Sequence, residues 1–426
     1  MIPDRTKPPL IKDAVNFDIH LPPYQLYKLN NGVPVYYIND GTEDVAVVEF
    51  VFKAGNNFEN KPFVSVATNA LLKNGTPTKT AFQITKIFEY YGAHISCRAH
   101  HDTATITLHC LSKYLRIILP LIREIITEAN FPQYELDIFQ QNQIQRIAVN
   151  LKKCDFVAGR IFDEILYGAQ HPYGRVYGKE DITNLNRDDL NQFFKEYYLN
   201  GQCKIFSAGR FPADFESMIN ENFGDLNIGE KTLPLSFPVK SADQKKYRIL
   251  NDPEGVQGAI RIGRPFPNRT HPDFKKAIVL NVLFGGYFGS RLMANIREEK
   301  GYTYGIHSFL QNHLDASSWM ISTEAGKDVC EATITEVYYE MELLRNEPPD
   351  EEELLLVKNY IMGLNLGYLD GPFNVISQWK SLILNNLDEE YFNDTIQQIK
   401  QVTAEELQSL AIKYLNPDEF FELVVI

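Results

Sequence analysis

An internal repeat constrains the fold more than any other feature of the chain. The pattern Ile-x-x-Leu-Asn-x-Asp-Asp-Leu at residues 182–190 returns as Ile-x-x-Val-Thr-x-Glu-Glu-Leu at residues 399–407, an offset of about 217 residues. Each copy is followed by Tyr-Leu-Asn, and a proline precedes a helical stretch in each half, at Pro132 and Pro349. Tyr-Gly-Ala-His at 91–94 likewise corresponds to Tyr-Gly-Ile-His at 304–307, and Asp102 corresponds to Asp315. A shared order at a nearly constant offset indicates a duplicated domain.

The hydrophobic pattern predicts strands and helices mixed within each copy. In the first half it predicts strands at 25–29, 33–39, 45–53, 95–99, 103–109 and 204–208, and helices at 62–73, 81–91, 114–128, 134–152, 156–167 and 187–198. This mixture is typical of an α+β fold, in which helices cover an antiparallel-rich sheet. We expect two homologous α+β domains, at residues 1–225 and 247–426. Residues 226–246 contain prolines, a glycine and lysines without periodicity, and we expect them to form the linker.

Charge and cysteine usage exclude several classes of protein. The formal net charge of −13 argues against nucleic-acid binding and against anionic membranes, both of which require clustered lysine and arginine. The five cysteines are scattered and odd in number, as expected of reduced thiols in a cytosolic protein. The N-terminal residues lack the apolar core of a signal peptide, and no apolar run approaches the length of a membrane span. These features predict a soluble, cytoplasmic protein.

Several segments together resemble the M16 (pitrilysin or insulinase-type) peptidases, across roughly residues 20–426. They are Lys-Asn-Gly-Thr at 73–76 before a helix, His-Pro-Tyr-Gly at 171–174, Phe-Gly-Gly at 284–286, and the stretch from Ser290 to Tyr304. The resemblance implies the family fold, in which two similar α+β domains form half of a clamshell around a peptide-binding chamber.

The resemblance also implies where the family's zinc ligands should lie. In this family the motif H-x-x-E-H supplies two histidine ligands and a general base, and a glutamate of a later helix completes the site. Counted from Gly75-Thr76, the motif falls at residues 66–70, where the histidines are replaced by Val66 and Ala70 and the base by Asn69. The later glutamate falls at Arg146, which is either a solvated surface residue or an ion-pair partner. We therefore expect no metal on this chain.

Other hydrolytic sites find little support in the sequence. No two histidines lie four residues apart with an acidic residue between them, and His100 and His101 should face opposite sides of a strand. No Ser-His-Asp, Cys-His or paired-carboxylate pattern stands out. An independent hydrolase remains a third alternative, which metal analysis and a peptide-cleavage assay would test.

An arginine and a tyrosine of the second half keep the family spacing. The sequence predicts a short helix at 291–300 with Ser290 as its N-cap and Gly301 as its C-terminal stop, followed by a strand near Thr303. The resemblance implies that Arg297 and Tyr304 reach toward a zinc site and act on the substrate. The alternative is structural, since arginine favours the last turn of a helix and tyrosine is common in strands. Tyr302 competes for the functional role because it lies only two residues away.

Three glycines precede this helix, Gly285, Gly286 and Gly289. Such a loop lets a peptide approach the backbone closely, and we consider these glycines candidate substrate-binding residues. A plain structural turn is the alternative. The loop is not a phosphate-binding loop, because no Gly-Lys-Ser/Thr follows.

Together these features favour one subunit of a split peptidase, as in bacterial family members that work as heterodimers. The partner would carry H-x-x-E-H, zinc, water and the general base, and this chain would supply Arg297 and Tyr304 for the hydrolysis of peptides. The rival interpretation is a non-catalytic peptide-binding or scaffold protein of the same fold. The isolated chain could also form a homodimer.

Overall fold

The fold is described from a computed structural model, which covers residue 6, residues 12–228 and residues 237–426. The first sheet has the order β1-β2-β6-β3-β5-β4. Its strands are β1 (Gln25–Lys28), β2 (Pro34–Asn39), β3 (Val45–Phe52), β4 (His94–Ala99), β5 (Ala104–Leu111) and β6 (Cys203–Gly209). The second sheet has the order β7-β11-β8-β10-β9. Its strands are β7 (Lys246–Ile249), β8 (Gln257–Phe266), β9 (Thr303–Asn312), β10 (Ser317–Gly326) and β11 (Phe421–Val425).

Strand order confirms the internal repeat. When the N-terminal strand β1 is set aside, β2-β6-β3-β5-β4 and β7-β11-β8-β10-β9 have the same connectivity. The single parallel pair also recurs, as β2 with β6 and as β7 with β11, while the remaining neighbours are antiparallel. The two halves are therefore two copies of one α+β unit, as the sequence predicts.

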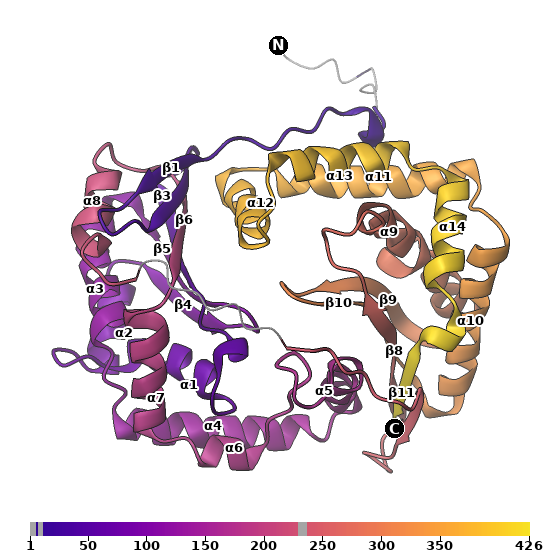
Figure 1. The fold of residues 1–426 in the computed structure, drawn as a ribbon, viewed down its shortest axis with the longest axis horizontal. Coiled ribbons are helices and arrows are strands. Elements are labelled where there is room, and N and C mark those ends of the chain that lie inside the picture. Colours follow the sequence, from indigo (N-terminus) through magenta and orange to yellow (C-terminus); the bar gives the residue numbers. More distant parts are fainter. Residues whose placement is uncertain (1–5, 7–11, 229–236) are drawn as a thin grey trace.

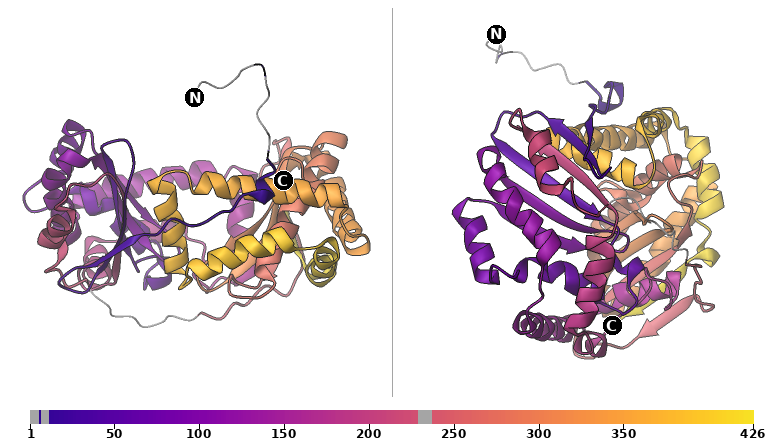
Figure 2. Two further views of the ribbon diagram at one scale, coloured as in Figure 1. Left: turned by 90° about the horizontal axis from the view of Figure 1, so that it is seen from above. Right: turned by 60° about the vertical axis from the view of Figure 1, so that its left-hand side comes forward.

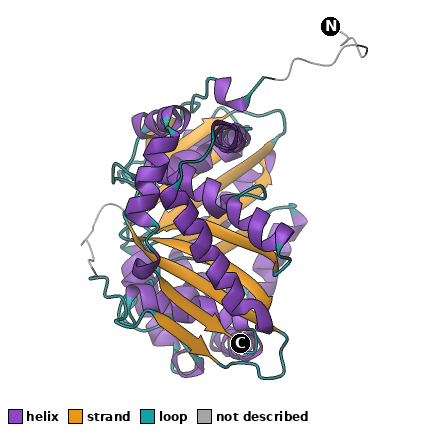
Figure 3. Ribbon diagram, turned by 90° about the vertical axis from the view of Figure 1, so that its right-hand side faces the viewer, coloured by secondary structure: helices purple, strands orange, loops and turns teal. Residues whose placement is uncertain are grey.

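Helices follow the strands in the same order in both halves. The first half has α1 (Val64–Leu71), α2 (Ala81–Tyr90), α3 (Leu115–Glu128), α4 (Gln133–Asn150), α5 (Cys154–Tyr167), α6 (Lys179–Thr183), α7 (Arg187–Phe194) and α8 (Phe215–Phe223). The second half has α9 (Phe274–Asn281), α10 (Cys330–Asn346), α11 (Glu351–Tyr368), α12 (Pro372–Leu384), α13 (Glu389–Gln401) and α14 (Ala404–Tyr414). Capping boxes begin α2 at Thr80, α7 at Asn186 and α14 at Thr403, where a side chain accepts the third backbone N–H of the helix. Figure 3 shows the helices lying over the strands.

The two halves exchange a helix. The apolar face of α5 packs on β8 and β11 of the second sheet, where Phe162 and Leu166 meet Leu423. In return α12 packs on β6 and β2 of the first sheet, and Trp379 contacts the ring of Tyr24 at 4.6 Å between centroids. Figure 1 shows α12 beside the first sheet and α5 beside the second. The sequence predicts both helices but not this exchange, so each sheet is completed by the other half of the chain.

The tips of two equivalent hairpins meet between the halves. Asp102, at the tip of β4–β5, accepts hydrogen bonds from the hydroxyl of Tyr173 (2.7 Å) and from the backbone N–H of Leu314 (3.2 Å), at the tip of β9–β10. The ring of His313 stacks on Tyr173 at 4.1 Å and contacts His101 at 4.7 Å between centroids. We call His101, Asp102, His171, Tyr173 and His313 the junction.

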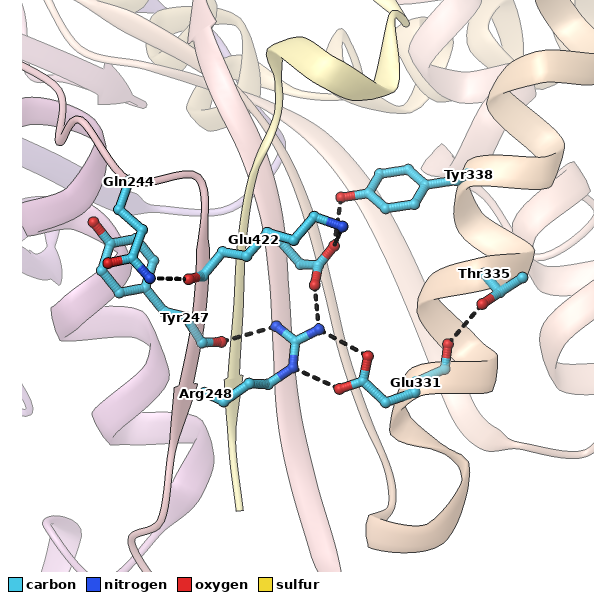
Figure 4. A network of polar contacts seen from close by, with 8 residues as sticks. Gln244, Tyr247, Arg248, Glu331, Thr335, Tyr338 and Glu422 are labelled. Atoms are coloured by element: carbon cyan, nitrogen blue, oxygen red, sulfur yellow. Dashed lines mark hydrogen bonds and ion pairs between the residues drawn. The ribbon is translucent and has the colours of Figure 1, made fainter.

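A buried carboxylate fixes the edge of the second sheet. Glu422 of β11 is 1% exposed, and its carboxylate accepts a hydrogen bond from the hydroxyl of Tyr338 on α10 at 2.8 Å. Arg248 of β7 pairs with both Glu422 and Glu331, as Figure 4 shows. This network ties β7, β11 and α10 together.

The connection between the halves follows α5. Residues 226–246, expected to form the linker, lie partly outside the described residues. Within the described part, backbone N–H groups of Lys240 and Ala242 donate to the carbonyl oxygens of Tyr167 and Ile165, and β7 already begins at Lys246. Among the described residues, no helix combines the length and apolarity that crossing a bilayer requires.

Candidate functional site

Helix α1, which occupies the position of the family's zinc helix, is held in place by buried contacts. Asn69 is 1% exposed, and its side-chain N–H groups donate to the hydroxyl of Tyr198 (2.9 Å) and to the carbonyl oxygen of Thr105 (3.4 Å). Burial raises the pKa of Tyr198, so its hydroxyl stays protonated. The residue at the position of the general base therefore connects α1 to the first sheet and to the segment that follows α7.

The three ligand positions do not fit a zinc ion. Val66 and Ala70 are half-buried and present only aliphatic groups, while Arg146 is exposed on α4, which packs against α1. Zinc requires three nitrogen, sulfur or carboxylate ligands, and a guanidinium repels it. No three His, Cys, Asp or Glu side chains of residues 12–228 and 237–426 are grouped so that they could hold a metal ion. Arg146 forms no ion pair with any residue in this described part, which favours the solvated-surface interpretation.

The start of α1 depends on a residue that the sequence analysis missed. The carboxylate of Glu59 accepts hydrogen bonds from the backbone N–H groups of Phe63 (3.1 Å) and Ser65 (3.2 Å). Phe63 has a left-handed φ of +73°, which is rare for a bulky side chain. Burial raises the pKa of Glu59 to about 7, although both hydrogen bonds and Arg175 act in the opposite direction. The sequence signal that could have identified this residue is a glutamate five residues before the helix.

The corner between residues 290 and 304 differs in part from the predicted helix. Residues 293–299 form a wider π-helical turn, and Gly301 has the left-handed φ of +68° expected just past a helix end. Ser290 occupies the predicted N-cap position, since its carbonyl oxygen accepts the backbone N–H of Ala294, but its buried hydroxyl makes no hydrogen bond to any described residue.

Arg297 and Tyr304 lie together at the surface of this corner. Arg297 Nε donates to the carbonyl oxygen of Tyr304 at 3.0 Å, and the guanidinium lies 4.6 Å over the ring of Phe288. A weaker contact joins Nη1 to Glu298 at 3.3 Å. Tyr304 is 92% exposed and sits near the start of β9, the edge strand of the second sheet. Its hydroxyl can therefore donate to an incoming group, and the arginine is held directly beside it. Phe288, which carries the guanidinium, was not predicted.

Tyr302 has a different environment from Tyr304. It lies before the start of β9 and packs partly buried against the main core of the second half. Because its side chain contributes to packing, Tyr304 is the better placed of the two to meet a ligand.

Polar contacts behind the corner hold it on neighbouring helices. Arg291 donates two hydrogen bonds to the carboxylate of Glu353 on α11, each 2.8 Å long. Asn295 donates to Glu340 on α10 at 2.7 Å. These contacts fix the backbone from which Arg297 projects, and charge-assisted pairs of this kind are stronger than neutral ones.

The three glycines have different surroundings. Gly285 is buried, and a Cβ added there would lie 2.7 Å from Cβ of Ser308, so this glycine allows a close approach between a helical turn and β9. Gly286 would bring a Cβ within 3.2 Å of the carbonyl oxygen of Asn281. Gly289 is exposed beside the ring of Tyr287. Packing explains Gly285, and a substrate role for Gly286 and Gly289 stays a prediction.

Comparisons with known proteins point to one family from both halves. Residues 34–165 match the family described as insulinase (peptidase family M16), and residues 184–361 match the family described as the peptidase M16 inactive domain. A Rickettsia felis protein described as an uncharacterized zinc protease is 25% identical over 344 residues, 79% of this chain and 82% of that protein. A Helicobacter pylori protein described as the non-peptidase homolog YmxG is 22% identical over 340 residues, 76% of this chain and 77% of that protein.

Comparison with solved structures leads to the same family. The crystal structure of a peptidase M16 inactive domain from Pseudomonas fluorescens is similar with a TM-score of 0.86 at 23% identity, and the match covers 94% of this chain and 98% of that one. The sequence matches in both halves and the duplicated α+β architecture lead to one conclusion. The chain belongs to the M16 peptidase family.

Proposed function

We propose that this chain is the non-zinc-binding subunit of a two-chain M16 metallopeptidase, to whose active site it contributes Arg297 and Tyr304. One observation carries the proposal. An almost fully exposed tyrosine hydroxyl, with an arginine fixed beside it, lies in a chain whose own zinc-helix positions are Val66, Asn69 and Ala70. Because the described residues contain no group that could hold a metal ion, the zinc on which such a pair would act has to come from another chain.

The chemistry of the pair suits peptide hydrolysis. Hydrolysis passes through a tetrahedral intermediate that carries a negative oxygen, and a phenol hydroxyl can donate a hydrogen bond to it. Removing one such donor typically costs about 10²–10³ in kcat. The guanidinium of Arg297 can hold a carbonyl or carboxylate oxygen of the substrate through its terminal N–H groups. The ring of Phe288 supports the guanidinium, whose Nη1 also contacts the carboxylate of Glu298 at 3.3 Å.

The partner we propose is a second M16 chain that carries H-x-x-E-H and supplies the zinc ion, the water and the general base. The two chains would enclose a chamber, each forming half of a clamshell, and unfolded peptides would enter it. An extended peptide can add to an exposed strand edge, and β9 presents such an edge directly beside Tyr304. We place this complex in the cytoplasm. A reading frame next to this one that encodes H-x-x-E-H would identify the partner.

Co-expression with that partner tests the proposal. Tyr304→Phe removes only the hydroxyl, and we expect kcat/KM for a fluorogenic peptide to fall about 10²–10³-fold. Arg297→Ala should also lower it strongly. Tyr339→Phe, at a 54% exposed position on α10, is the matched control and should change kcat/KM less than twofold. Activity that survives both Arg297→Ala and Tyr304→Phe would rule out this role.

A non-catalytic scaffold or peptide-binding protein is the second candidate. It is favoured by the Helicobacter pylori relative described as a non-peptidase homolog, which covers much of the same sequence. In that case Tyr304→Phe would change neither the partner's peptidase activity nor the formation of the complex.

A further inference from the structure

Helix α11 is apolar on the side that faces solvent as well as on the side that faces the core. Leu354, Val357, Ile361 and Met362 are buried beneath it. On its outer side, large apolar residues are 36–57% exposed: Leu355, Leu356, Tyr360, Leu364, Leu366 and Tyr368. Leu356, Tyr360, Leu364 and Tyr368 follow one another at four-residue intervals along one side of the helix, and we call these four residues the outer face of α11. Leu355 and Leu366 lie on the other flank, near Asn359, whose side chain accepts a hydrogen bond from the backbone N–H of Val15 in the short helix η1 (Ala14–Asn16) that packs on α11. From Asn359 to Leu369 the sequence holds no charged residue. An exposed apolar patch of this kind often marks a binding site.

The equivalent helix of the first half lacks this property. Helix α4 corresponds to α11 in the repeat, and its exposed residues include Gln141, Asn142, Gln145 and Arg146. The exposed large apolar residues of α4, Tyr134 and Val149, lie near its two ends, so the middle of this helix is polar in the first half and apolar in the second. Since the shared architecture does not require an apolar outer side, the second half has acquired it for a separate reason.

The outer face is continuous with the Arg297–Tyr304 corner. The ring of Tyr287 lies against Tyr360 of α11, with 4.8 Å between centroids. The next residue, Phe288, is 61% exposed and lies under the guanidinium of Arg297. The pair of Arg291 and Glu353 joins the same turn to the N-terminal end of α11. The neighbouring residues Tyr287 and Phe288 thus contact α11 on one side and Arg297 on the other, and Arg297 contacts the backbone of Tyr304.

Two glycines shape this surface. Nothing lies within 4 Å of a Cβ built on Gly363 or on Gly367, so both face open space between the neighbouring large side chains. The helix therefore presents Tyr360, Leu364 and Tyr368 as separate projections with gaps beside them. A row of projections and gaps suits the spaced side chains of an extended peptide.

We propose that the outer face of α11, together with Tyr287 and Phe288, binds bulky apolar side chains of the extended peptide whose backbone reaches Tyr304. This deepens the proposed function and rests on it. The surface selects peptides that carry leucine or aromatic residues, which unfolded chains expose and folded proteins bury. Hydrophobic burial supplies the affinity, and the charged residues that would oppose it are absent from this stretch of α11.

Peptide binding to the purified chain, without partner or zinc, tests the inference. We would measure fluorescence anisotropy with a labelled ten-residue peptide that has leucine and phenylalanine at alternate positions, and with a counterpart carrying serine at those positions. The double variant Leu356→Glu/Leu364→Glu should weaken binding of the apolar peptide at least tenfold. Gly363→Glu should weaken it as well, and it places its charge where the helix has room and gains by losing a glycine.

A matched double variant controls for added charge. Ile117→Glu/Ile412→Glu alters two exposed isoleucines on α3 and α14, which are 47% and 54% exposed, and should leave binding within twofold. The inference is overturned by any of three results: no binding of the apolar peptide, equal binding of the serine peptide, or unchanged binding by the α11 variants. A wild-type dimer that the α11 double variant dissociates, measured by light scattering, would also overturn it, because the face would then join two copies.

The outcomes separate this inference from the proposed function. Loss of activity in Tyr304→Phe together with peptide binding that ignores the α11 variants removes only the inference. Peptide binding that depends on α11, in a chain whose Tyr304→Phe variant leaves the partner's activity unchanged, removes only the catalytic role.

Discussion

The two halves of the chain share one strand order but use it differently. In the first half, α1 carries Val66, Asn69 and Ala70, and the side-chain amide of Asn69 donates a hydrogen bond to the buried hydroxyl of Tyr198. In the second half, Tyr304 is 92% exposed at the end of an edge strand, with Arg297 beside it. In the first copy this helix therefore contributes packing contacts, whereas the second copy presents the polar side chains of Arg297 and Tyr304 at the surface. The comparison teaches that the shared strand order accommodates either use, with Asn69 contributing buried contacts in the first copy and Arg297 and Tyr304 lying at the surface in the second.

The parallel strand pairs of the two sheets differ in the side chain that they bury, and mutation can test this difference. Ile205 of β6 is fully buried at the position that Glu422 occupies in β11, each beside the parallel strand of its sheet. Lys246 and Arg248 stand on β7 where β2 has Val35 and Tyr37, so at these positions of the parallel neighbour only the second sheet offers cations. Ile205→Glu should therefore bury an unpaired carboxylate and cost more than about 4 kcal/mol of unfolding free energy.

The reciprocal change is the control. Glu422→Ile should cost about 2 kcal/mol, since Tyr338 loses its acceptor but Arg248 keeps Glu331. Urea unfolding at neutral pH measures both. Equal costs for the two substitutions would show that the buried network does not distinguish the sheets.

The equivalent aspartates at the hairpin tips should differ as well. Asp102 accepts hydrogen bonds from Tyr173 and Leu314 across the junction, whereas the described residues offer no hydrogen-bond partner to the exposed carboxylate of Asp315. Asp102→Ala is expected to cost about 1–3 kcal/mol, because three donors lose their acceptor, the third being the side-chain amide of Asn57. Asp315→Ala should stay within about 0.5 kcal/mol. Urea midpoints for both variants check this, and a larger effect for Asp315 would contradict the assigned asymmetry.

The junction histidines should make the first-to-second-half contact sensitive to acid. Burial and the neighbouring His101 and His171 lower the pKa of His313 to about 3, and burial also lowers the pKa of both neighbours. Between pH 6.5 and about 3 the unfolded chain then binds a proton at residue 313 that the folded chain does not. Stability from this residue is present above pH 6.5 and falls as pH decreases, by up to about 1.4 kcal/mol per pH unit.

His313→Phe keeps a ring against Tyr173 and removes the titrating group. We expect the slope of unfolding free energy between pH 6.5 and 4 to become shallower, while His20→Phe at an exposed position leaves it unchanged. Differences between variants are the proper measure, because Glu59 and Asp163 have pKa values raised to about 7 by burial and act in the opposite sense. An unchanged slope in His313→Phe would refute the assignment.

Local signals gave most of the architecture from sequence. Strand alternation placed β3 and β5 to within a residue or two, and the repeat of residues 182–190 at 399–407 predicted two copies of one unit. The exchange of α5 and α12 was out of reach, because periodicity shows that a helix has an apolar face but not which sheet that face covers. Ser290 stands at the predicted N-cap position, but its hydroxyl does not bond to the helix, since sequence does not fix whether a side chain turns toward the backbone N–H groups.

The candidate site was predicted unevenly. The roles of Arg297 and Tyr304 were implied by the family resemblance, and the structure puts the two residues in contact through a backbone carbonyl. The contribution of Phe288 was not predicted, because it depends on a turn that brings its ring under a guanidinium nine residues later. The structure shows Tyr304 to be far more exposed than Tyr302, and exposure at a helix-to-strand corner is set by tertiary packing.

The helix exchange also means that the first sheet is synthesised well before the helix that covers it. The first sheet is complete once β6 leaves the ribosome, but the helix that covers its inner surface begins only at Pro372, roughly 160 residues later. At a translation rate of about 5–20 residues per second, that surface stays uncovered for about 8–30 s before α12 is synthesised. During this interval the nascent chain carries a finished sheet with a bare apolar side, which is the kind of surface that chaperones bind.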